Sequence, residues 1–329
     1  MDYGKVPGID KPISRLVQGT TMLHTSHLDE DFALLDAILE AGGTTFDTAH
    51  GYSAECERSL GAWINDRGIQ DQVVILGKGA LHNQDRQRVT PYDITSDLHD
   101  SLARMNIDFI DLYVLHRDDP RNPVGPIVDV LNEHHKAGKI GSFGGSNWTP
   151  ARIAEANAYA AANGLKPFVV SSPNFSMAVQ KESPWENCLS IAGPEASADR
   201  AWYKEQKMPL FVWSSLAGGF LTGRFRRDNL HTFSGYDDEL VVRCYGTDEN
   251  FGRIERAEEI AKEKGLTLPQ ISLSYVLHSG LDVYALVGTR TGGEFRENIS
   301  ASQVKLNADE VAYIGLLTTR EEKLICSNS

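Results

Sequence analysis

The chain has 329 residues, of which 41% are hydrophobic, and 32 Lys and Arg stand against 45 Asp and Glu, so the formal net charge is −13. This composition is typical of a globular protein with enough apolar residues for a large core. The acidic balance argues against nucleic acids and membranes as partners, since both need a basic face, and no window approaches the roughly 18 uninterrupted apolar residues of a membrane-spanning helix.

Short apolar runs alternate with longer amphipathic stretches along the whole chain. Eight of the short runs predict strands: Ile13–Val17, Thr45–Asp47, Val73–Gly77, Phe109–Leu115, Ile140–Gly144, Phe168–Ser172, Leu210–Trp213 and Tyr284–Val287. Four amphipathic stretches with the spacing of a one-sided helix lie between them: Asp31–Ala41, Asp93–Met105, Val124–Ala137 and Pro150–Ala162.

Alternating strands and helices indicate a parallel sheet, and eight units favour a closed (β/α)8 TIM barrel with long loops at its C-terminal face. We predict one barrel domain over residues 1–329. An open doubly wound sheet would favour a Gly-x-Gly-x-x-Gly turn near the N-terminus, and the chain has none. Two polar segments, Ser176–Asp199 and Arg224–Asn250, show no regular pattern, and because both follow strands we expect them at the mouth of the barrel.

Four polar side chains fall at or just after the ends of three consecutive strands: Asp47, Tyr52, Lys78 and His116. A lysine ammonium near a tyrosine would lower the phenol pKa from its usual value of about 10, and an aspartate would fix the lysine. The histidine could orient a carbonyl oxygen while Tyr52 donates a proton and a hydride reaches the carbon. Each residue alone also has a structural explanation: a helix cap, a solvated charge, a packed ring or a hydrogen-bonded core histidine.

Six sequence blocks, in order, carry a resemblance to a known family. They are Phe46–Ala49 with Tyr52, the Cys56-Glu57-x-x-Leu60-Gly61 segment, Lys78, the Tyr113–Asp119 segment around His116, Gly138–Trp148 and Phe211–Phe225. In these blocks the chain resembles the aldo-keto reductases over nearly its whole length. The resemblance implies that Tyr52 is the general acid, that Lys78 and Asp47 tune it, and that His116 positions the carbonyl group.

The resemblance also implies a nicotinamide coenzyme across the barrel mouth. Ser146 and Asn147 would hold its carboxamide, with Ser172 where relatives carry Gln, and Trp213, in place of the commoner Tyr, would stack on the nicotinamide. The other implied contacts run from the nicotinamide ribose through the pyrophosphate to the adenosine: Gly19, Thr20, Ser214, Leu216, Gly218, Arg224, Gly288, Thr289, Arg290, Glu294, Glu297 and Asn298. Arg290 favours the 2′-phosphate of NADP(H), whereas Glu294 would repel it. The usual coenzyme of the family that the chain resembles favours NADP(H), and NAD(H) stays the alternative.

Met22, Trp148, Phe175 and Trp185 are the predicted walls of the substrate pocket. Aromatic walls with scattered polar groups suit a sugar-type carbonyl compound and also a small aldehyde or ketone. We therefore predict a metal-free oxidoreductase that acts on a small carbonyl or alcohol. The alternatives are a coenzyme-binding sensor or regulatory subunit with little turnover and, ranked last, a sugar epimerase or lyase. The oligomeric state is not readable from the sequence.

Cysteines and histidines point to no further chemistry. The four cysteines, Cys56, Cys188, Cys244 and Cys326, form no Cys-x-x-Cys pair, and with no secretion signal a reducing cytoplasm is the expected location. The closely spaced histidines lack the His-Glu-x-x-His spacing of a zinc helix, so we predict no metal.

Overall fold

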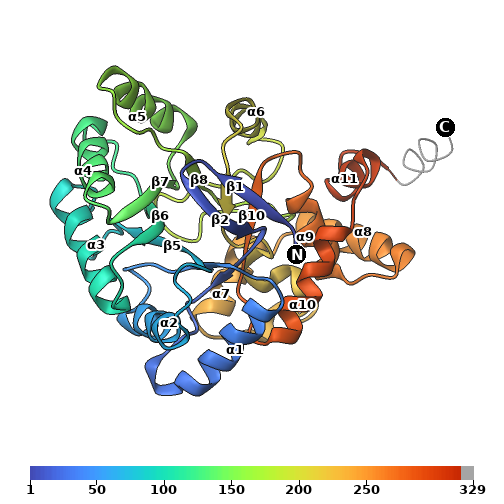
Figure 1. The fold of residues 1–329 in the computed structure, drawn as a ribbon. Helices are drawn as coiled ribbons and strands as arrows, with labels where there is room; N and C mark the ends of the chain where they lie inside the picture. The colour runs from blue at the N-terminus through green and yellow to red at the C-terminus, as the bar shows by residue number, and fades with distance from the viewer. Residues whose placement is uncertain (320–329) are drawn as a thin grey trace.

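The computed structural model describes residues 1–319, and at its centre is a closed barrel of eight parallel strands (Figure 1). The barrel strands are β3 (Leu16–Gly19), β4 (Thr45–Asp47), β5 (Val74–Gly79), β6 (Ile110–Leu115), β7 (Ile140–Ser146), β8 (Val170–Ser172), β9 (Leu210–Val212) and β10 (Val283–Val287). Each pairs with the next along the chain, and β10 pairs with β3 to close the ring. The predicted (β/α)8 TIM barrel is confirmed.

The first predicted strand, Ile13–Val17, is wrong in its boundaries. The chain first makes an antiparallel hairpin, β1 (Tyr3–Val6) and β2 (Ile9–Ser14), and β3 begins only at Leu16. The break falls at Ser14, whose backbone N–H donates to the side chains of Thr44 and Thr45 instead of to a strand neighbour. The hairpin covers the N-terminal end of the barrel, where Lys11 donates to the carbonyls that precede β5. It crosses the middle of the molecule in Figure 1.

Helices surround the barrel. They are α1 (Leu28–Glu40), α2 (Ala54–Arg67), α3 (Pro91–Met105), α4 (Val124–Lys136), α5 (Pro150–Ala162), α6 (Ser197–Gln206), α7 (Tyr236–Tyr245), α8 (Asp248–Lys264), α9 (Leu268–Leu277), α10 (Gly292–Ser300) and α11 (Ala308–Ile314), with short 3-10 turns at Thr25–His27, Ala217–Thr222, Leu230–Thr232 and Ala301–Gln303. The four helices predicted from periodicity are confirmed to within three residues. Two of them, α3 and α5, begin with a threonine cap followed by a proline, which fixes the first turn.

Apolar side chains fill the barrel and separate it from the helices. The interior is packed by residues such as Val17, Leu76, Val114 and Phe211, and the Phe211 ring stacks on that of Tyr284 at 4.5 Å between centroids. A second apolar cluster joins α7, α8, α9 and α11 to the segment after β9. The barrel is therefore a packed core, and its chemistry is confined to the mouth.

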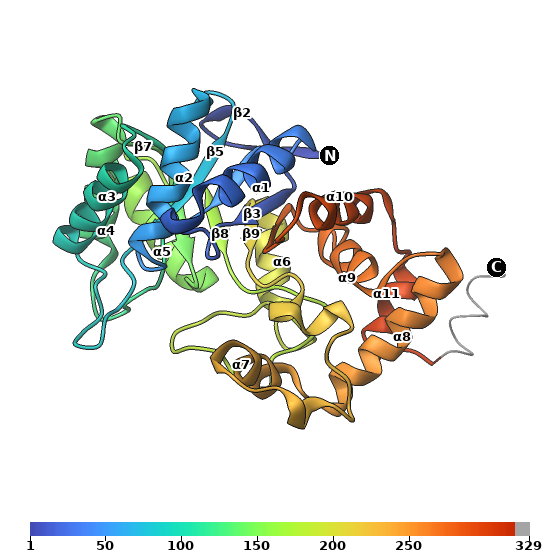
Figure 2. The ribbon, with the colours of Figure 1, turned by 90° about the horizontal axis from the view of Figure 1, so that it is seen from below.

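The two long segments lie at the end of the barrel opposite the hairpin (Figure 2). Ser176–Asp199 is irregular until α6 begins at Ser197, as expected. Arg224–Asn250 is not irregular, because it contains α7 and the start of α8. The helix α7 was not predicted from the sequence, because only three of its residues, Val241, Cys244 and Tyr245, are buried and its apolar pattern is weak.

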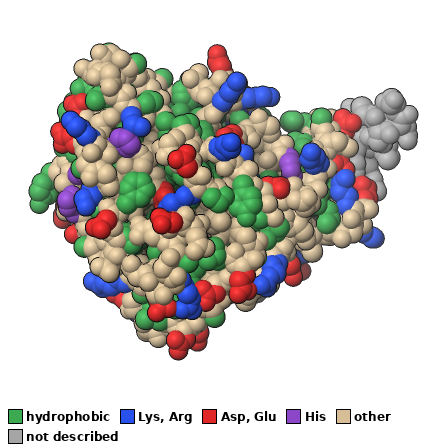
Figure 3. Space-filling view, in the orientation of Figure 1, with side chains coloured by type: hydrophobic (Ala, Val, Ile, Leu, Met, Phe, Trp, Pro, Cys, Tyr) green, Lys and Arg blue, Asp and Glu red, His purple; other side chains and the backbone are tan. Residues whose placement is uncertain are grey.

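The surface carries charges of both signs. On the face shown in Figure 3, acidic and basic side chains are interspersed. Within residues 1–319, none of the helices is both long and apolar enough to cross a membrane.

Candidate active site

The side chains of Asp47, Tyr52, Lys78 and His116 meet at the C-terminal end of the barrel. Asp47 ends β4, Lys78 lies near the end of β5, and His116 follows β6. Lys78 Nζ forms an ion pair with Asp47 and donates to the hydroxyl of Tyr52 at 3.1 Å. The Tyr52 hydroxyl donates to Asp47 at 3.1 Å, and its ring lies 5.7 Å from that of His116, almost perpendicular to it.

Burial decides the protonation of this cluster. Burial raises the pKa of Asp47 and lowers that of Lys78, although the ion pair between them opposes both shifts. Burial, with the charge of Asp47, raises the pKa of Tyr52 well above 10, which corrects the expectation that Lys78 lowers it. The pKa of His116 falls well below 6.5, first through burial and then through the charges of Lys78 and Arg117. At neutral pH the phenol is therefore protonated and the imidazole neutral.

Backbone hydrogen bonds join β5 to residues 48–53, the segment between β4 and α2 that we call the Tyr52 loop. The His50 N–H donates to the Lys78 carbonyl at 2.9 Å, and the His116 N–H donates to the Gly79 carbonyl at 2.7 Å. These bonds join the Tyr52 loop to the ends of β5 and β6, and they hold the four side chains close to one another.

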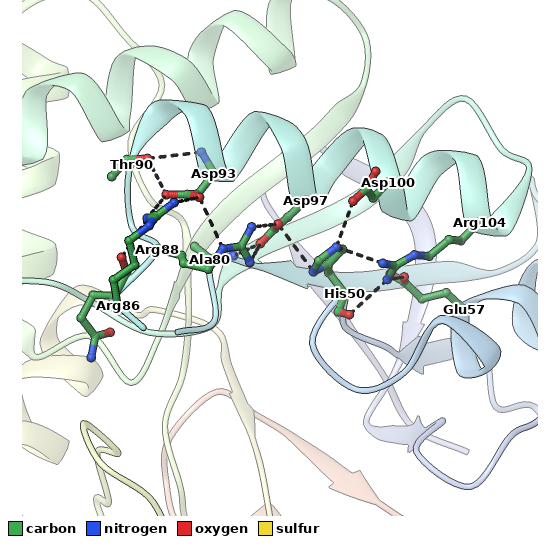
Figure 4. Close-up of polar contacts among 11 residues, drawn as sticks. His50, Glu57, Ala80, Arg86, Arg88, Thr90, Asp93, Asp97, Asp100 and Arg104 are labelled. Atoms are coloured by element: carbon green, nitrogen blue, oxygen red, sulfur yellow. Dashed lines mark hydrogen bonds and ion pairs between the residues drawn. The ribbon is translucent and has the colours of Figure 1, made fainter. Parts of the chain in front are cut away.

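A second cluster of charges, which we call the α3 network, supports the same loop from the outside (Figure 4). Asp97 is fully buried and accepts from the Ala80 N–H at 2.8 Å and from Arg88. His50 faces Asp97 at 3.5 Å on one ring nitrogen, and on the other it meets Asp100 and Arg104, both at 3.2 Å. The remaining members are Glu57, which pairs with Arg104, and Asp93, which pairs with Arg86 and Arg88 and accepts from Thr90.

A row of polar groups follows β7 and β8. Asn147 has a positive φ of 62°, and its side chain donates to the His116 carbonyl and to Ser146. Its amide oxygen accepts from Leu189 and from the indole N–H of Trp213 at 3.3 Å. Ser146 donates to the carbonyl of Ser172, whose own hydroxyl is buried and has no hydrogen-bond partner among the described residues.

The segment after β9 has an unusual backbone. Ser214, Ala217 and Gly218 have positive φ values of 52°, 53° and 64°. Such conformations in residues other than glycine gather where a backbone must be held in a particular shape, often at binding sites. Leu216 is half-buried within this turn, and the Trp213 ring is half-buried and lies 6.2 Å from that of Trp185. Arg224 is not a free cation, since it pairs with Asp238.

The ends of β3 and β10 meet beside this segment. Thr289 is buried and exchanges hydrogen bonds with Gln18, and Thr20 donates to the Asp47 carbonyl at 2.9 Å. A Cβ atom on Gly288 would meet only the Met22 methyl at 3.8 Å, whereas one on Gly19 would meet the Val287 carbonyl at 3.5 Å.

The following helix, α10, begins with two local hydrogen bonds between side chain and backbone. Thr291 caps it, and the Glu294 carboxylate accepts from the Arg290 N–H at 2.7 Å. Arg290, Glu294 and Glu297 are exposed, and Asn298 is buried.

A sequence model of the Aldo/keto reductase family matches residues 15–317 of the chain. The chain belongs to the aldo/keto reductase family. It is similar to an aldo-keto reductase of Strobilurus tenacellus, with 27% identity over 89% of this chain and 82% of the relative. It is also similar to a probable aryl-alcohol dehydrogenase of Saccharomyces cerevisiae, with 26% identity over 87% of each chain, and to norsolorinic acid reductase of Emericella nidulans, with 28% identity over 85% and 70%.

Membership makes this chain an oxidoreductase of a family that generally uses nicotinamide coenzymes and acts on small carbonyl or alcohol compounds. The coenzyme site that membership implies is compatible with residues at the mouth. The orphaned hydroxyl of Ser172, the accessible ring of Trp213 and the open space above Gly288 lie around the C-terminal ends of the strands.

Two of the predicted pocket walls in this aldo/keto reductase lie in the interior. Trp148 has no exposed surface, packs on Phe168 at 5.0 Å between ring centroids and donates to the Arg117 carbonyl. Phe175 is 3% exposed and packs near Tyr275. Trp148 packs between β7 and Arg152 of α5, and Phe175 packs against α9, so both rings belong to the core. Met22 is half-buried, and Trp185 is 43% exposed and donates to the hydroxyl of Tyr236 at 2.9 Å.

Sequence reasoning did not single out Arg117 or the α3 network. Arg117 follows His116 directly and is 4% exposed, so its position beside a predicted site residue was the available signal. The network had no signal in the sequence, because its members are dispersed among α2, α3 and two loops.

Proposed function

We propose that this aldo/keto reductase transfers a hydride between a nicotinamide coenzyme, preferably NADP(H), and a carbonyl or alcohol substrate, with Tyr52 as general acid and base. The observation that carries the proposal is the contact of the Tyr52 hydroxyl with both Lys78 and Asp47 beside a neutral His116. In carbonyl reduction the coenzyme supplies the hydride. Tyr52 then gives its proton to the substrate oxygen, and in alcohol oxidation the proton returns to it.

The other three residues have distinct tasks. Lys78 stabilises the phenolate that remains after proton transfer, because its ammonium group already donates to the phenol oxygen. Asp47 keeps that ammonium charged in a buried position. The imidazole of His116 stays neutral and orients the carbonyl oxygen without competing as an acid.

The coenzyme would lie across the mouth, with Ser146, Asn147 and Ser172 near its carboxamide and Trp213 against its nicotinamide ring. Asn147 already uses its side-chain amide for four protein contacts, so its role would be to fix Trp213 and His116 as much as to bind the coenzyme. We keep the assignment of Gly19, Thr20, Ser214, Leu216, Gly218, Arg224, Gly288, Thr289, Glu297 and Asn298 to coenzyme contacts.

The preference for NADP(H) rests on Arg290, which is exposed and has no ion pair within residues 1–319. Glu294, one helical turn away, works against a 2′-phosphate. Replacing Glu294 by Gln should lower the KM for NADP(H) several-fold and leave that for NAD(H) nearly unchanged. Steady-state rates with each coenzyme measure this, and a large advantage of the native enzyme for NAD(H) would reverse the preference.

The substrate remains a sugar-type carbonyl or a small aldehyde or ketone. The name of the yeast relative, a probable aryl-alcohol dehydrogenase, supports an aromatic member of the second group. For location we retain the cytoplasm, because the three described cysteines are free, while Cys326 lies outside the described residues.

Replacing Tyr52 by Phe tests the proposal. Removing the proton donor should lower carbonyl reduction by about 10²–10⁴-fold while coenzyme binding, followed by tryptophan fluorescence, persists. The exposed Tyr92, replaced by Phe, is the matched control and should keep full activity. Unchanged turnover of the Tyr52 variant would exclude it as the donor, and coenzyme binding by the native protein without turnover of any carbonyl or alcohol would favour the sensor alternative.

A further inference from the structure

Arg117 is a buried cation with no carboxylate partner. It is 4% exposed, yet no ion pair joins it to any Asp or Glu within residues 1–319. Its neighbours Asp118 and Asp119 are already paired, with Arg152 and Arg121 respectively. An isolated buried charge is costly unless something compensates for it.

The known contacts of Arg117 use only part of its guanidinium group. Nε donates to the Glu186 carbonyl at 3.3 Å, Nη1 donates to the His116 carbonyl at 2.8 Å, and a side-chain contact joins it to Cys188. An arginine has five N–H donors in a planar fork. Two of the five therefore have no acceptor among the described residues, and backbone carbonyls and a thiol do not neutralise the charge.

The guanidinium group also lies within electrostatic reach of the reacting centre. Its charge acts on Tyr52, Lys78 and His116, all of which belong to the proposed catalytic cluster. Within that cluster Lys78 is balanced by Asp47, so Arg117 leaves one net positive charge beside the place where the carbonyl group would bind.

We infer that Arg117 binds a carboxylate group of the substrate, so that the preferred substrate is a carbonyl compound that carries one negative charge. This inference rests on the proposed function and specifies its substrate class. A carboxylate fits because a guanidinium fork binds its two oxygens side by side, and because one buried cation balances one negative charge. The contacts to Glu186 and Cys188 join the fork to the segment Ser176–Asp199 and orient it.

Matched pairs of substrates test the inference on the native enzyme. Glyoxylate, succinic semialdehyde and 4-formylbenzoate are each compared with their methyl esters, which keep the aldehyde and remove the charge. For the pair whose length fits, the acid should be favoured by about tenfold or more in kcat/KM, mainly through KM, because the charge contact is made in both ground and transition states.

Variants separate binding from mere support of the loop. Arg117→Met should abolish the preference for the acid, so that the acid-to-ester ratio of kcat/KM falls to about one whatever happens to ester turnover itself. Arg117→Lys should retain part of the preference because it keeps the charge but not the fork. Arg121→Met, which removes an exposed cation that is 74% accessible, is the control of equal charge and should keep the preference.

The outcomes are distinct. Ester turnover with no preference for any acid in the native enzyme, or an equal loss of acid and ester turnover in both Arg117 variants, would overturn the inference and leave the proposed function standing. Absence of turnover of every acid and ester with either coenzyme would overturn the inference, and the proposed function would fall with it only if the native protein also turned over no other carbonyl or alcohol.

Discussion

Two clusters of charged side chains contact the Tyr52 loop, and they respond differently to burial. In the proposed catalytic cluster, the side chains of Asp47 and Lys78 are both 3% exposed, and burial outweighs their pairing, so each pKa shifts in the direction that favours the neutral form. In the α3 network, Arg86 is half exposed. The pKa of Asp93, although burial raises it, is lowered overall by hydrogen bonds from Arg86 and Thr90 and by the nearby arginines.

The difference indicates separate roles. An ion pair with no access to water is a poor source of stability but a good means of holding charges next to a reacting group. An ion pair with one partner in water contributes a little stability, and the pKa of its carboxyl group is lowered, as is usual for a paired carboxylate. The first cluster is suited to proton transfer, and the second holds the loop that positions it.

The largest expected effect comes from breaking the Asp47–Lys78 pair. Lys78→Met leaves a buried carboxyl without its partner and should cost about 3–5 kcal/mol of unfolding free energy, together with nearly all carbonyl reduction. The double variant Asp47→Leu/Lys78→Met removes both charges and should recover most of the stability but none of the turnover. Urea unfolding and coenzyme absorbance measure the two effects. Recovery of turnover in the double variant would contradict the catalytic role of the pair.

The sequence sufficed for the barrel and for the meeting of the four predicted site residues because the two depend on the same geometry. Once strands follow one another in parallel, residues such as Asp47, Lys78 and His116 at consecutive strand ends are brought to one mouth. The sequence pattern does not show which way a ring just after a strand end points. Trp148, predicted in the pocket wall, is therefore found buried in the core.

The raised pKa of Tyr52 and the end of the strand at Ser14 were not predicted from the sequence, for a related reason. The sequence predicts a lysine near Tyr52 but not how much water surrounds the phenol, and burial together with the charge of Asp47 raises the phenol pKa. The run from Ile13 to Val17 holds the polar pair Ser14-Arg15 between apolar residues, and the periodicity does not show that one strand ends at Ser14 and the next begins at Leu16. The hydrogen bonds from the Ser14 N–H to Thr44 and Thr45 mark this break.

An intermediate effect is expected at Asp97, which links the α3 network to the end of β5. It accepts from the N–H of Ala80, a residue with a positive φ of 62° that lies two positions after Lys78. Asp97→Ala leaves this N–H without its partner and should cost about 1–3 kcal/mol, with a lower kcat, because the end of β5 is released. Both are measured by urea unfolding and steady-state kinetics at saturating coenzyme.

Asp100→Ala is the matched control for this change. It touches the same histidine but is 56% exposed, and we expect it to alter stability by about 0.5 kcal/mol or less. If Asp97→Ala destabilises the protein yet leaves kcat intact, the network serves the fold alone and the division of roles between the two clusters has to be drawn elsewhere.

The smallest effect separates the clusters by pH. Since the folded-state pKa of Asp93 is lowered from its ordinary value of 3.8, its contribution to stability is present above that value and is lost as the pH falls through the folded-state pKa. Asp93→Asn should therefore cost about 1 kcal/mol or less at pH 7, since Arg86 is half exposed, and the difference should shrink below about pH 4. Urea unfolding of both proteins from pH 7 to pH 3 measures it. The pKa of Asp47 is raised instead, so ionisation of its carboxyl group lowers the stability of the fold as the pH rises. If the stability difference between Asp93→Asn and the native protein grows in acid, burial governs both clusters alike.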